Sequence, residues 1–432
     1  MECFNDLHPN QFGYKKNSSC KQAHFVVNET INYYKHGGSK VHLISLDATK
    51  AFDRLWRDGL FYKLIGKIPK ELWRILYLYY KNSKIKVKLN GIVSESVSTY
   101  EGVKQGGVLS PYLFNFFINN LITSCIEKNI GAKIDKFLVP IIAYCDDIIL
   151  LAPSFNHCQC LLSECAEFAK TWKLEFNASK SVGVSLYKSK ITFDSNFSLN
   201  GNIIPNVSGF IYLGLPIGSN EFLYDFLEKK WKSVEKSMFS LYGLGCKPKM
   251  MSPNLVSFLF KTYCQSIFRH VLDNVFISET KLKEFDKRQN LLIKQVIGLK
   301  KYSKMKELRN AIDLDSVRAL YCKHKIFFLR HIEKSNVCSG IFKYLKDHYV
   351  KFDRQNTSFC KQIDFLSKKL YVDCTKYSYK ISLEIIVHHF KSKNNGLTDS
   401  IKYVISMITS LMNQKNEFFY LYNGLNLLLK PG

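Results

Sequence analysis

The sequence predicts an α+β protein, with an antiparallel sheet and its helices in the N-terminal half and helices alone in the C-terminal half. Apolar runs of strand length, such as VHLISLD at Val41–Asp47, end at polar residues. Alternating apolar and polar residues surround Asn90-Gly91, a dipeptide typical of tight hairpins. From Asp225 onward, apolar residues recur at helical spacing among many lysines.

Strands are expected in four segments. Val41–Asp47 and Lys180–Tyr187 are predicted as single strands, and Lys84–Tyr100 as a hairpin. Leu138–Pro153 is apolar, then polar, then apolar again, which indicates a strand, a turn and a second strand.

Helices are predicted where apolar residues recur every three or four positions. Ser110-Pro111 favours a helix start, because the fixed φ of proline suits the first turn. The predicted helices are about Cys20–Tyr34, Gly59–Lys81, Tyr112–Ile126, Cys158–Trp172, Asp225–Leu244 and Thr280–Leu299.

The chain is long enough for more than one domain. Its 432 residues, 46% of them hydrophobic, suffice for a sizeable core and two or three domains. No linker rich in Pro, Gly or Ser divides the sequence, so we place the borders where the residue pattern changes. The predicted domains are residues 1–222, 223–330 and 331–432.

Positive charge is concentrated in the C-terminal half. Of 62 Lys and Arg residues, 25 lie in residues 1–224 and 37 in residues 225–432, whereas the 36 acidic residues divide into 18 and 18. The net charges of the two halves are therefore +7 and +19. Such a field attracts a polyanion such as nucleic acid, while a lysine-rich composition that merely solvates helix faces is the alternative.

Cysteine usage favours a reducing, intracellular compartment. The 13 cysteines are odd in number and include no CxxC pair. The opening MECFNDLHPNQFGYKK has no apolar signal core. The apolar run Pro111–Ile126 is interrupted by Asn115, Asn119 and Asn120, so we expect a buried helix and no membrane partner.

Three carboxylates stand at the ends of apolar strands, namely Asp47, Asp146 and Asp147. An ionised Asp is unfavourable there by several kcal/mol unless a cation or hydrogen bonds compensate it. Adjacent Asp146 and Asp147 also repel each other, which would raise the pKa of one of them. A metal site explains all three residues, whereas a solvent-exposed acidic turn explains only the adjacent pair.

Carboxylate oxygens suit Mg²⁺ or Mn²⁺ better than Zn²⁺. Two such ions would serve phosphoryl transfer, one activating an attacking hydroxyl and one steadying the leaving pyrophosphate. A second possible metal cluster, of Cys322, His324, His331 and Cys338, lacks the spacing of a zinc knuckle. We expect these four to be core or surface residues and the segment ALYCKHKIFFLRHIEK to be one helix.

Six blocks of the sequence resemble the motifs of reverse transcriptases, in the family's order. SLDATKAF, GVKQGGVLSPYLFN and AYCDDIIL resemble its palm motifs. HPNQFGYKKNSS, WKLEFNASKS and GFIYLGLPIG narrow the resemblance to non-LTR, LINE-type and jockey-like, retrotransposon enzymes. The blocks cover about residues 8–218 and imply a right-hand polymerase fold with a palm, partial fingers, and a helical thumb and C-terminal region.

The resemblance implies roles for ten residues. Asp47, Asp146 and Asp147 would be the catalytic carboxylates and would hold two Mg²⁺ or Mn²⁺ ions together with the Ala48 carbonyl. Asp53 is not assigned a catalytic role. In this block the metal-binding carboxylate is the first Asp, and Asp53, which follows the step from strand to helix, would point elsewhere. The implied nucleotide-binding and primer-grip residues are Phe52 as a gate against the 2′-hydroxyl, Gln105, Gly106, Lys180, Leu213 and Gly214.

The implied function is an RNA-directed DNA polymerase, a nucleotidyltransferase acting with template RNA, a DNA primer and dNTPs in the cytoplasm and nucleus. In the motif Tyr144-Cys145-Asp146-Asp147, Cys145 stands where the family usually has alanine or methionine, which is a conservative change. Upstream fingers strands are expected to be missing, so a catalytically inactive, truncated remnant that binds nucleic acid is the alternative. A group II intron maturase or telomerase relative is a third possibility. The oligomeric state does not follow from the sequence.

Overall fold

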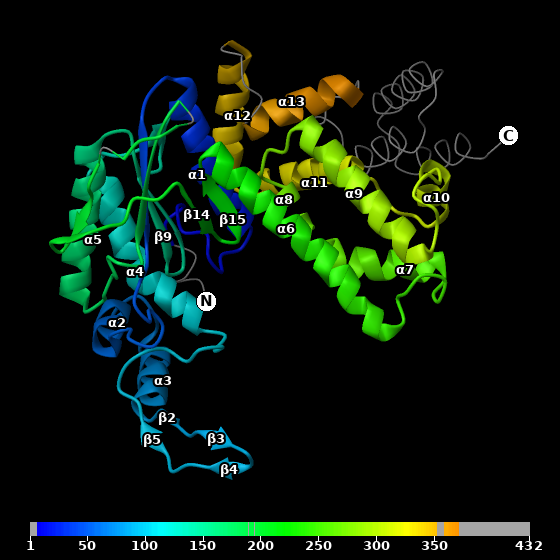
Figure 1. The fold of residues 1–432 in the computed structure, drawn as a ribbon. Helices are drawn as coiled ribbons and strands as arrows, with labels where there is room; N and C mark the ends of the chain where they lie inside the picture. Colours follow the sequence, from blue (N-terminus) through cyan, green and yellow to red (C-terminus); the bar gives the residue numbers. More distant parts are fainter. Residues whose placement is uncertain (1–6, 189, 194, 352–357, 371–432) are drawn as a thin grey trace, which may run out of the picture. The chain divides into compact units, whose positions relative to one another are not determined.

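The computed structural model describes residues 7–188, 190–193, 195–351 and 358–370 (Figure 1). The chain divides into two compact units, and each is described by itself. The first unit comprises Met1–Lys230 and His331–Phe359, and the second comprises Trp231–Arg330 and Cys360–Gly432. The functional borders near residues 222 and 330 remain predictions.

The first unit is built on a five-stranded antiparallel sheet with the strand order β11-β10-β1-β9-β8. Ile44 of β1 pairs with Leu150 of β9 on one side and with Gly183 of β10 on the other. The predicted α+β class and antiparallel sheet are confirmed. The strands are β1 Val41–Leu46, β8 Ile141–Tyr144, β9 Asp147–Ala152, β10 Val182–Tyr187 and β11 Lys190–Ile191.

Helices cover both faces of this sheet, which is why its central strands are mostly apolar on both sides. Helices α4 (Ser110–Glu127) and α5 (Phe155–Trp172) pack on one face, and α1 (Cys20–His36) packs on the other (Figure 1). Phe114, Phe117 and Leu161 are fully buried against the sheet. All three helices lie where the sequence predicted them, within a few residues.

The prediction of a single helix over Gly59–Lys81 was wrong. Two helices form instead, α2 (Arg57–Leu64) and α3 (Lys70–Lys81). Gly66 has φ +70, and Pro69 directly precedes α3. A proline disfavours helical backbone in the residue before it, so the chain turns between the two helices.

The predicted hairpin at Lys84–Tyr100 is confirmed, and it extends away from the sheet beyond α3 (Figure 1). Asn90 and Gly91 form its turn with φ +48 and +85, as a tight hairpin turn requires. Its strands are short and exposed: β2 Lys84–Ile85, β3 Lys88–Leu89, β4 Ile92–Val93 and β5 Val97–Ser98.

Three further two-stranded hairpins and one distant helix complete the first unit. The hairpins are β6 Lys133–Ile134 with β7 Phe137–Leu138, β12 Ser198–Leu199 with β13 Asn202–Ile203, and β14 Gly209–Tyr212 with β15 Leu215–Gly218. Helix α12 (Asn336–Lys351) packs on α1, where Tyr33 contacts the rings of Tyr344 and His348. Residues remote in sequence thus belong to the first unit.

The second unit is helical in its described part. Trp231 stacks on Phe285 at 4.6 Å between ring centroids, and Phe268 meets both rings edge-on. Its helices are α6 (Asn220–Ser240, from Trp231), η2 (Leu241–Leu244), α7 (Pro253–Leu259), η3 (Phe260–Cys264), α8 (Ser266–Leu272), α9 (Glu279–Ile297), α10 (Lys306–Ala311), α11 (Val317–Ile332) and α13 (Phe359–Leu370). The predicted helices at 225–244 and 280–299 are confirmed.

Helix α11 contains Cys322, His324 and His331 on one continuous helix, as predicted. His324 Nδ1 lies 3.1 Å from the buried carboxylate of Asp273. No helix in the described part of the chain has the length and apolar character needed to traverse a membrane. Of the predicted region 331–432, residues 371–432 lie outside the described residues.

Candidate active site

The turn between β8 and β9 places two carboxylates at the end of a buried hairpin. Tyr144 pairs with Asp147, so Cys145 and Asp146 form a two-residue turn. Cys145 has φ +54, in the left-handed region that a residue with a side chain seldom adopts. Asp146 is half-buried and Asp147 is exposed. A strained turn of this kind at a polar site is often functional.

Strand pairing brings Asp47 to the same place. Leu46 at the end of β1 pairs with Ile148 of β9, so Asp47 and Asp147 stand next along the two strands. Because side chains alternate between sheet faces, both point away from the face that Leu46 and Ile148 share. Strands distant in sequence thus present two carboxylates side by side.

The three aspartates repel one another. Asp147 keeps an exposed surface, but its carboxylate is partly desolvated. This partial desolvation, followed by the charges of Asp146 and Asp47, raises the pKa of Asp147 to about 6. Burial and the charge of Asp47 raise the pKa of Asp146 as well. Across the part of the chain that the structure describes, no three His, Cys, Asp or Glu side chains already converge as a metal-binding group. The three aspartates are therefore neighbours whose charges disfavour one another.

The loop after Asp47 is held by the segment before β10. Asn177 N–H donates to the Asp47 carbonyl at 2.8 Å, and Asp47 N–H donates to Ser181 Oγ at 3.1 Å. Ala48 lies opposite Phe176 in this pairing. The Asn177 side chain also accepts from the N–H of Lys180, an exposed residue. The structure therefore brings Ala48 and Lys180 into the surroundings of Asp47.

Phe52 lies five residues after Asp47 and is half-buried. Its ring stacks on Phe114 of α4, with 5.0 Å between centroids. Its carbonyl accepts from Val103 N–H at 2.7 Å. Gly102 has φ +75, and a Cβ there would lie 2.3 Å from the Asp53 carbonyl oxygen. Only glycine allows the two segments to approach this closely.

Gln105 and Asp53 join the same two segments through their side chains. Gln105 Nε2 donates to both carboxylate oxygens of Asp53, at 2.8 and 2.9 Å. The next residue, Gly106, has φ +76 and open space around its Cα. Asp53 thus points toward an amide group and has its own partner.

The β14–β15 hairpin contains the other predicted pair. Leu213 and Gly214 form its turn, with φ +52 and +79. The adjacent Tyr212 is buried, and burial followed by the negative charge of Asp147 raises its pKa. Its hydroxyl has no hydrogen-bond partner within the described residues. Tyr212 thus belongs to the electrostatic surroundings of Asp147.

Two contributors were not foreseen from the sequence. Ser181 anchors the Asp47 amide, and Gln11, fully buried, accepts from the amide of Cys145 at 3.1 Å. The available signal was the presence of polar residues within the quoted blocks HPNQFGYKKNSS and WKLEFNASKS. Their partners could not be inferred, because each pair is 134 residues apart.

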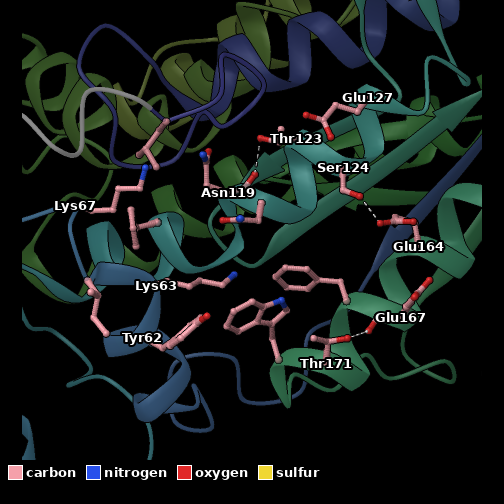
Figure 2. Close-up of a pocket in the computed structure, with 16 residues that line it drawn as sticks. Tyr62, Lys63, Lys67, Asn119, Thr123, Ser124, Glu127, Glu164, Glu167 and Thr171 are labelled. Carbon is pink, nitrogen blue, oxygen red and sulfur yellow. Dashed lines mark hydrogen bonds between the residues drawn. The ribbon is translucent and has the colours of Figure 1, made fainter.

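A separate cavity of about 990 Å³ is lined by residues of α2, α4 and α5 (Figure 2). Lys63 Nζ donates to the Phe117 carbonyl at 2.6 Å and lies 3.7 Å from the centroid of a Trp172 ring. Burial lowers the pKa of Lys63 to about 7. None of the three aspartates is among the residues that line this cavity.

The N-terminal half of the chain is similar in sequence to known reverse transcriptases. A family described as reverse transcriptase (RNA-dependent DNA polymerase) matches residues 1–217, half of the chain. The RNA-directed DNA polymerase from mobile element jockey of Drosophila melanogaster is 28% identical over 214 residues, which cover 48% of this chain and 23% of that protein. The Pol polyprotein from type-2 retrotransposable element R2DM of the same species is 29% identical over 180 residues, covering 41% and 17%.

The chain spans about a quarter or less of the length of these two relatives. Among solved structures, apo telomerase from Candida tropicalis aligns with 79% of this chain and 56% of its own, at 12% identity and a TM-score of 0.38.

Proposed function

Because the chain belongs to the reverse transcriptase family, we propose that it is an RNA-directed DNA polymerase of the non-LTR retrotransposon type. It extends the 3′-hydroxyl of a DNA primer with dNTPs on an RNA template. The observation that carries this proposal is the meeting of Asp47 with Asp146 and Asp147 at the ends of paired strands. Its distant relatives are reverse transcriptases of non-LTR retrotransposons.

The chemistry of this cluster fits two Mg²⁺ or Mn²⁺ ions. Its donors are hard carboxylate oxygens, and the raised pKa values of Asp146 and Asp147 reflect burial and uncompensated repulsion. Asp47, Asp146 and Asp147, with the Ala48 carbonyl, would hold the ions. Two divalent cations would lower the pKa of the attacking hydroxyl and neutralise charge on the triphosphate.

The surrounding residues bind and orient the nucleotide. Phe52 fills the space beneath the sugar and excludes a 2′-hydroxyl, a role supported by its half-buried ring braced on Phe114. Gln105 and Gly106 lie along the nascent base pair, where the open space at Gly106 admits a close approach. Lys180 gives a proton to the leaving pyrophosphate.

The remaining parts hold the nucleic acid. Leu213 and Gly214 grip the primer end, a role that their place at the turn of the β14–β15 hairpin supports. The helices of residues 223–330 form the thumb, which contacts phosphates without reading sequence. Its exposed lysines support this role: Lys232 and Lys236 on α6, and Lys283 and Lys287 on α9.

Primer extension tests the proposal. The full chain is incubated with poly(rA)/oligo(dT), dTTP and Mg²⁺, beside Asp146→Asn and the control Asp135→Asn. Asp135 also occupies a turn between two strands, with φ +52, and is exposed. We expect Mg²⁺-dependent incorporation by the wild type and Asp135→Asn, and a loss of at least about 100-fold in Asp146→Asn. The proposal is rejected if Asp146→Asn incorporates dTTP as well as the wild type does. It is also rejected if the wild type incorporates none.

A second candidate is a catalytically inactive remnant that binds nucleic acid. The net charge of +19 in residues 225–432 favours it. RNA binding that weakens with salt and survives Asp146→Asn, without incorporation by the wild type, would select this function over the first.

A further inference from the structure

A short N-terminal segment lies beside the edge strand β8 and reaches the β8–β9 turn. Ala143 N–H donates to the Asn10 carbonyl at 3.0 Å, and Phe12 N–H donates to the Ala143 carbonyl at 2.8 Å. Gln11 pairs with Ala143 in parallel orientation. The side-chain amide of Asn10 also donates to the backbone carbonyls of Leu138 and Ile141. The segment is therefore held against the edge of β8 by one parallel bridge and by the Asn10 side chain.

The Gln11 side chain ends at the amide of the strained residue. Its Oε1 accepts from Cys145 N–H at 3.1 Å and from Gly13 N–H at 2.8 Å. Both partners are donors, so the amide orientation is fixed and the oxygen must face the turn. Gln11 and Cys145 are both buried, at 0% and 3% exposure. Without Gln11, the Cys145 N–H would lose its acceptor in a buried place.

Gly13 and Asn115 close the contact from the other side. A Cβ on Gly13 would lie 2.7 Å from Cys145 N and 2.9 Å from its Sγ, so the turn packs directly on the Gly13 backbone. Asn115 of α4, also fully buried, donates to the Gly13 carbonyl at 2.7 Å. The contact thus fixes the position of the turn on two sides.

The arrangement leaves buried polar atoms unpaired. Within the described residues, Gln11 Nε2 and Asn115 Oδ1 have no hydrogen-bond partner. An apolar pair of similar size would avoid this cost in an ordinary core. Unpaired buried groups in a folded protein need an explanation, and holding the Cys145 amide supplies one.

We propose that Gln11 is a positioning residue for nucleotidyl transfer, which acts through the Cys145 N–H to hold the turn that presents Asp146 and Asp147. This inference rests on the proposed function. Gln11 itself touches no reacting atom. Gln11 affects the alignment of the two carboxylates. Cys145 has φ +54, an unfavourable value, and without the hydrogen bond to Gln11 this residue would shift to a more extended conformation.

Two variants perturb the contact differently. Gln11→Met removes the acceptor and keeps the volume, whereas Gly13→Ala keeps the acceptor and pushes on the Cys145 amide. Gln22→Met is the matched control: Gln22 is also buried, at 2% exposure, and its amide donates to the His331 carbonyl. All are made in the full chain and compared at equal fractions folded, measured by thermal melting.

The first readout is Mn²⁺ binding, followed by electron paramagnetic resonance of the free ion, which needs no turnover. The second is the Mg²⁺ concentration for half-maximal primer extension, with kcat and the KM for dTTP. Residues that orient metal ligands typically change affinity or activity by about 10- to 100-fold. We expect that loss in Mn²⁺ affinity and in kcat for both Gln11→Met and Gly13→Ala, a higher Mg²⁺ requirement, and wild-type behaviour in Gln22→Met.

Equal Mn²⁺ binding by the wild type and Gln11→Met overturns the inference, as does an equal loss in Gln11→Met and Gln22→Met. No binding by the wild type overturns it as well. If the wild type binds Mn²⁺ but extends no primer, the proposed function fails, and the same comparison of binding constants still decides the role of Gln11.

Discussion

The mutual repulsion of the three aspartates links stability to pH and metal ions, and Asp147→Asn perturbs it most directly. Partial desolvation of the carboxylate, followed by the charges of Asp146 and Asp47, raises the pKa of Asp147 from 3.8 to about 6. A pKa raised on folding contributes stability that is present below the unfolded pKa and is lost as pH rises through the folded pKa. The metal-free chain therefore loses this contribution between about pH 4 and pH 6.

The shift of about two pKa units corresponds to about 3 kcal/mol at 1.36 kcal/mol per unit. Asp147 is exposed, so solvent screening reduces this figure, and we expect about 1 kcal/mol. Asparagine keeps the shape of the side chain and removes its charge. Asp147→Asn should therefore be about 1 kcal/mol more stable than the wild type at pH 7.5 without metal, and equal to it near pH 4.

Denaturation by urea from pH 4 to pH 8 in EDTA measures this difference, with Asp135→Asn as the control for removing one exposed turn carboxylate. A second series adds Mg²⁺. At a concentration 100 times its dissociation constant, the ion should stabilise the wild type by about 2.7 kcal/mol and Asp147→Asn by less. The reasoning is refuted if Asp147→Asn is no more stable than the wild type at pH 7.5 without metal, or if Mg²⁺ stabilises both equally.

Two further outcomes follow from particular contacts. Gly102→Ala should destabilise the chain by about 2 to 5 kcal/mol in urea denaturation, since it combines positive-φ strain with a Cβ 2.3 Å from the Asp53 oxygen. Gly106→Ala has a similar φ in open space and should lose only about 1 to 2 kcal/mol. Burial lowers the pKa of Lys63 to about 7. The free energy of unfolding of the wild type, measured in urea, should therefore rise above pH 7 by about 1 kcal/mol per pH unit relative to that of Lys63→Met. Parallel pH profiles of the two proteins would contradict this.

The parts of the fold that local pattern encodes were predictable. Alternation around Asn90-Gly91 gave the hairpin, and the apolar run broken at Asp146-Asp147 gave β8, its turn and β9. Both signals depend on residues within one element, where side-chain period and turn chemistry act together. The positions of Asp47, Asp146 and Asp147 at strand ends were predictable for the same reason, because a charge at the end of a buried strand is conspicuous, whereas their catalytic role remains a prediction.

The break between α2 and α3 was missed although Gly66 and Pro69 were visible. Apolar residues continue at helical spacing across the break, and the prediction of one helix followed this spacing. Pro69 nevertheless disfavours helical backbone in the residue before it, so the first helix ends upstream of Pro69. The breaker residues were the better guide here. A proline excludes one conformation of the preceding residue, whereas periodicity only favours another.

Side-chain contacts to the backbone of the site could not be predicted from local pattern. Ser181 holds the Asp47 amide, and Gln11 holds the Cys145 amide, in both cases across 134 residues. No spacing rule links such residues, since the chain between them folds into several elements. Their polarity alone does not distinguish them from other polar residues of the same blocks.

Asp53 shows why residue type and position alone do not define the site. It lies six residues after Asp47 in the same block, yet its carboxylate accepts two hydrogen bonds from the Gln105 amide. Asp147 instead faces two other carboxylates and has its pKa raised to about 6. A cation relieves repulsion where like charges meet, so a bound cation would stabilise the proposed cluster of Asp47, Asp146 and Asp147. It would gain less beside Asp53, whose carboxylate already has a neutral donor.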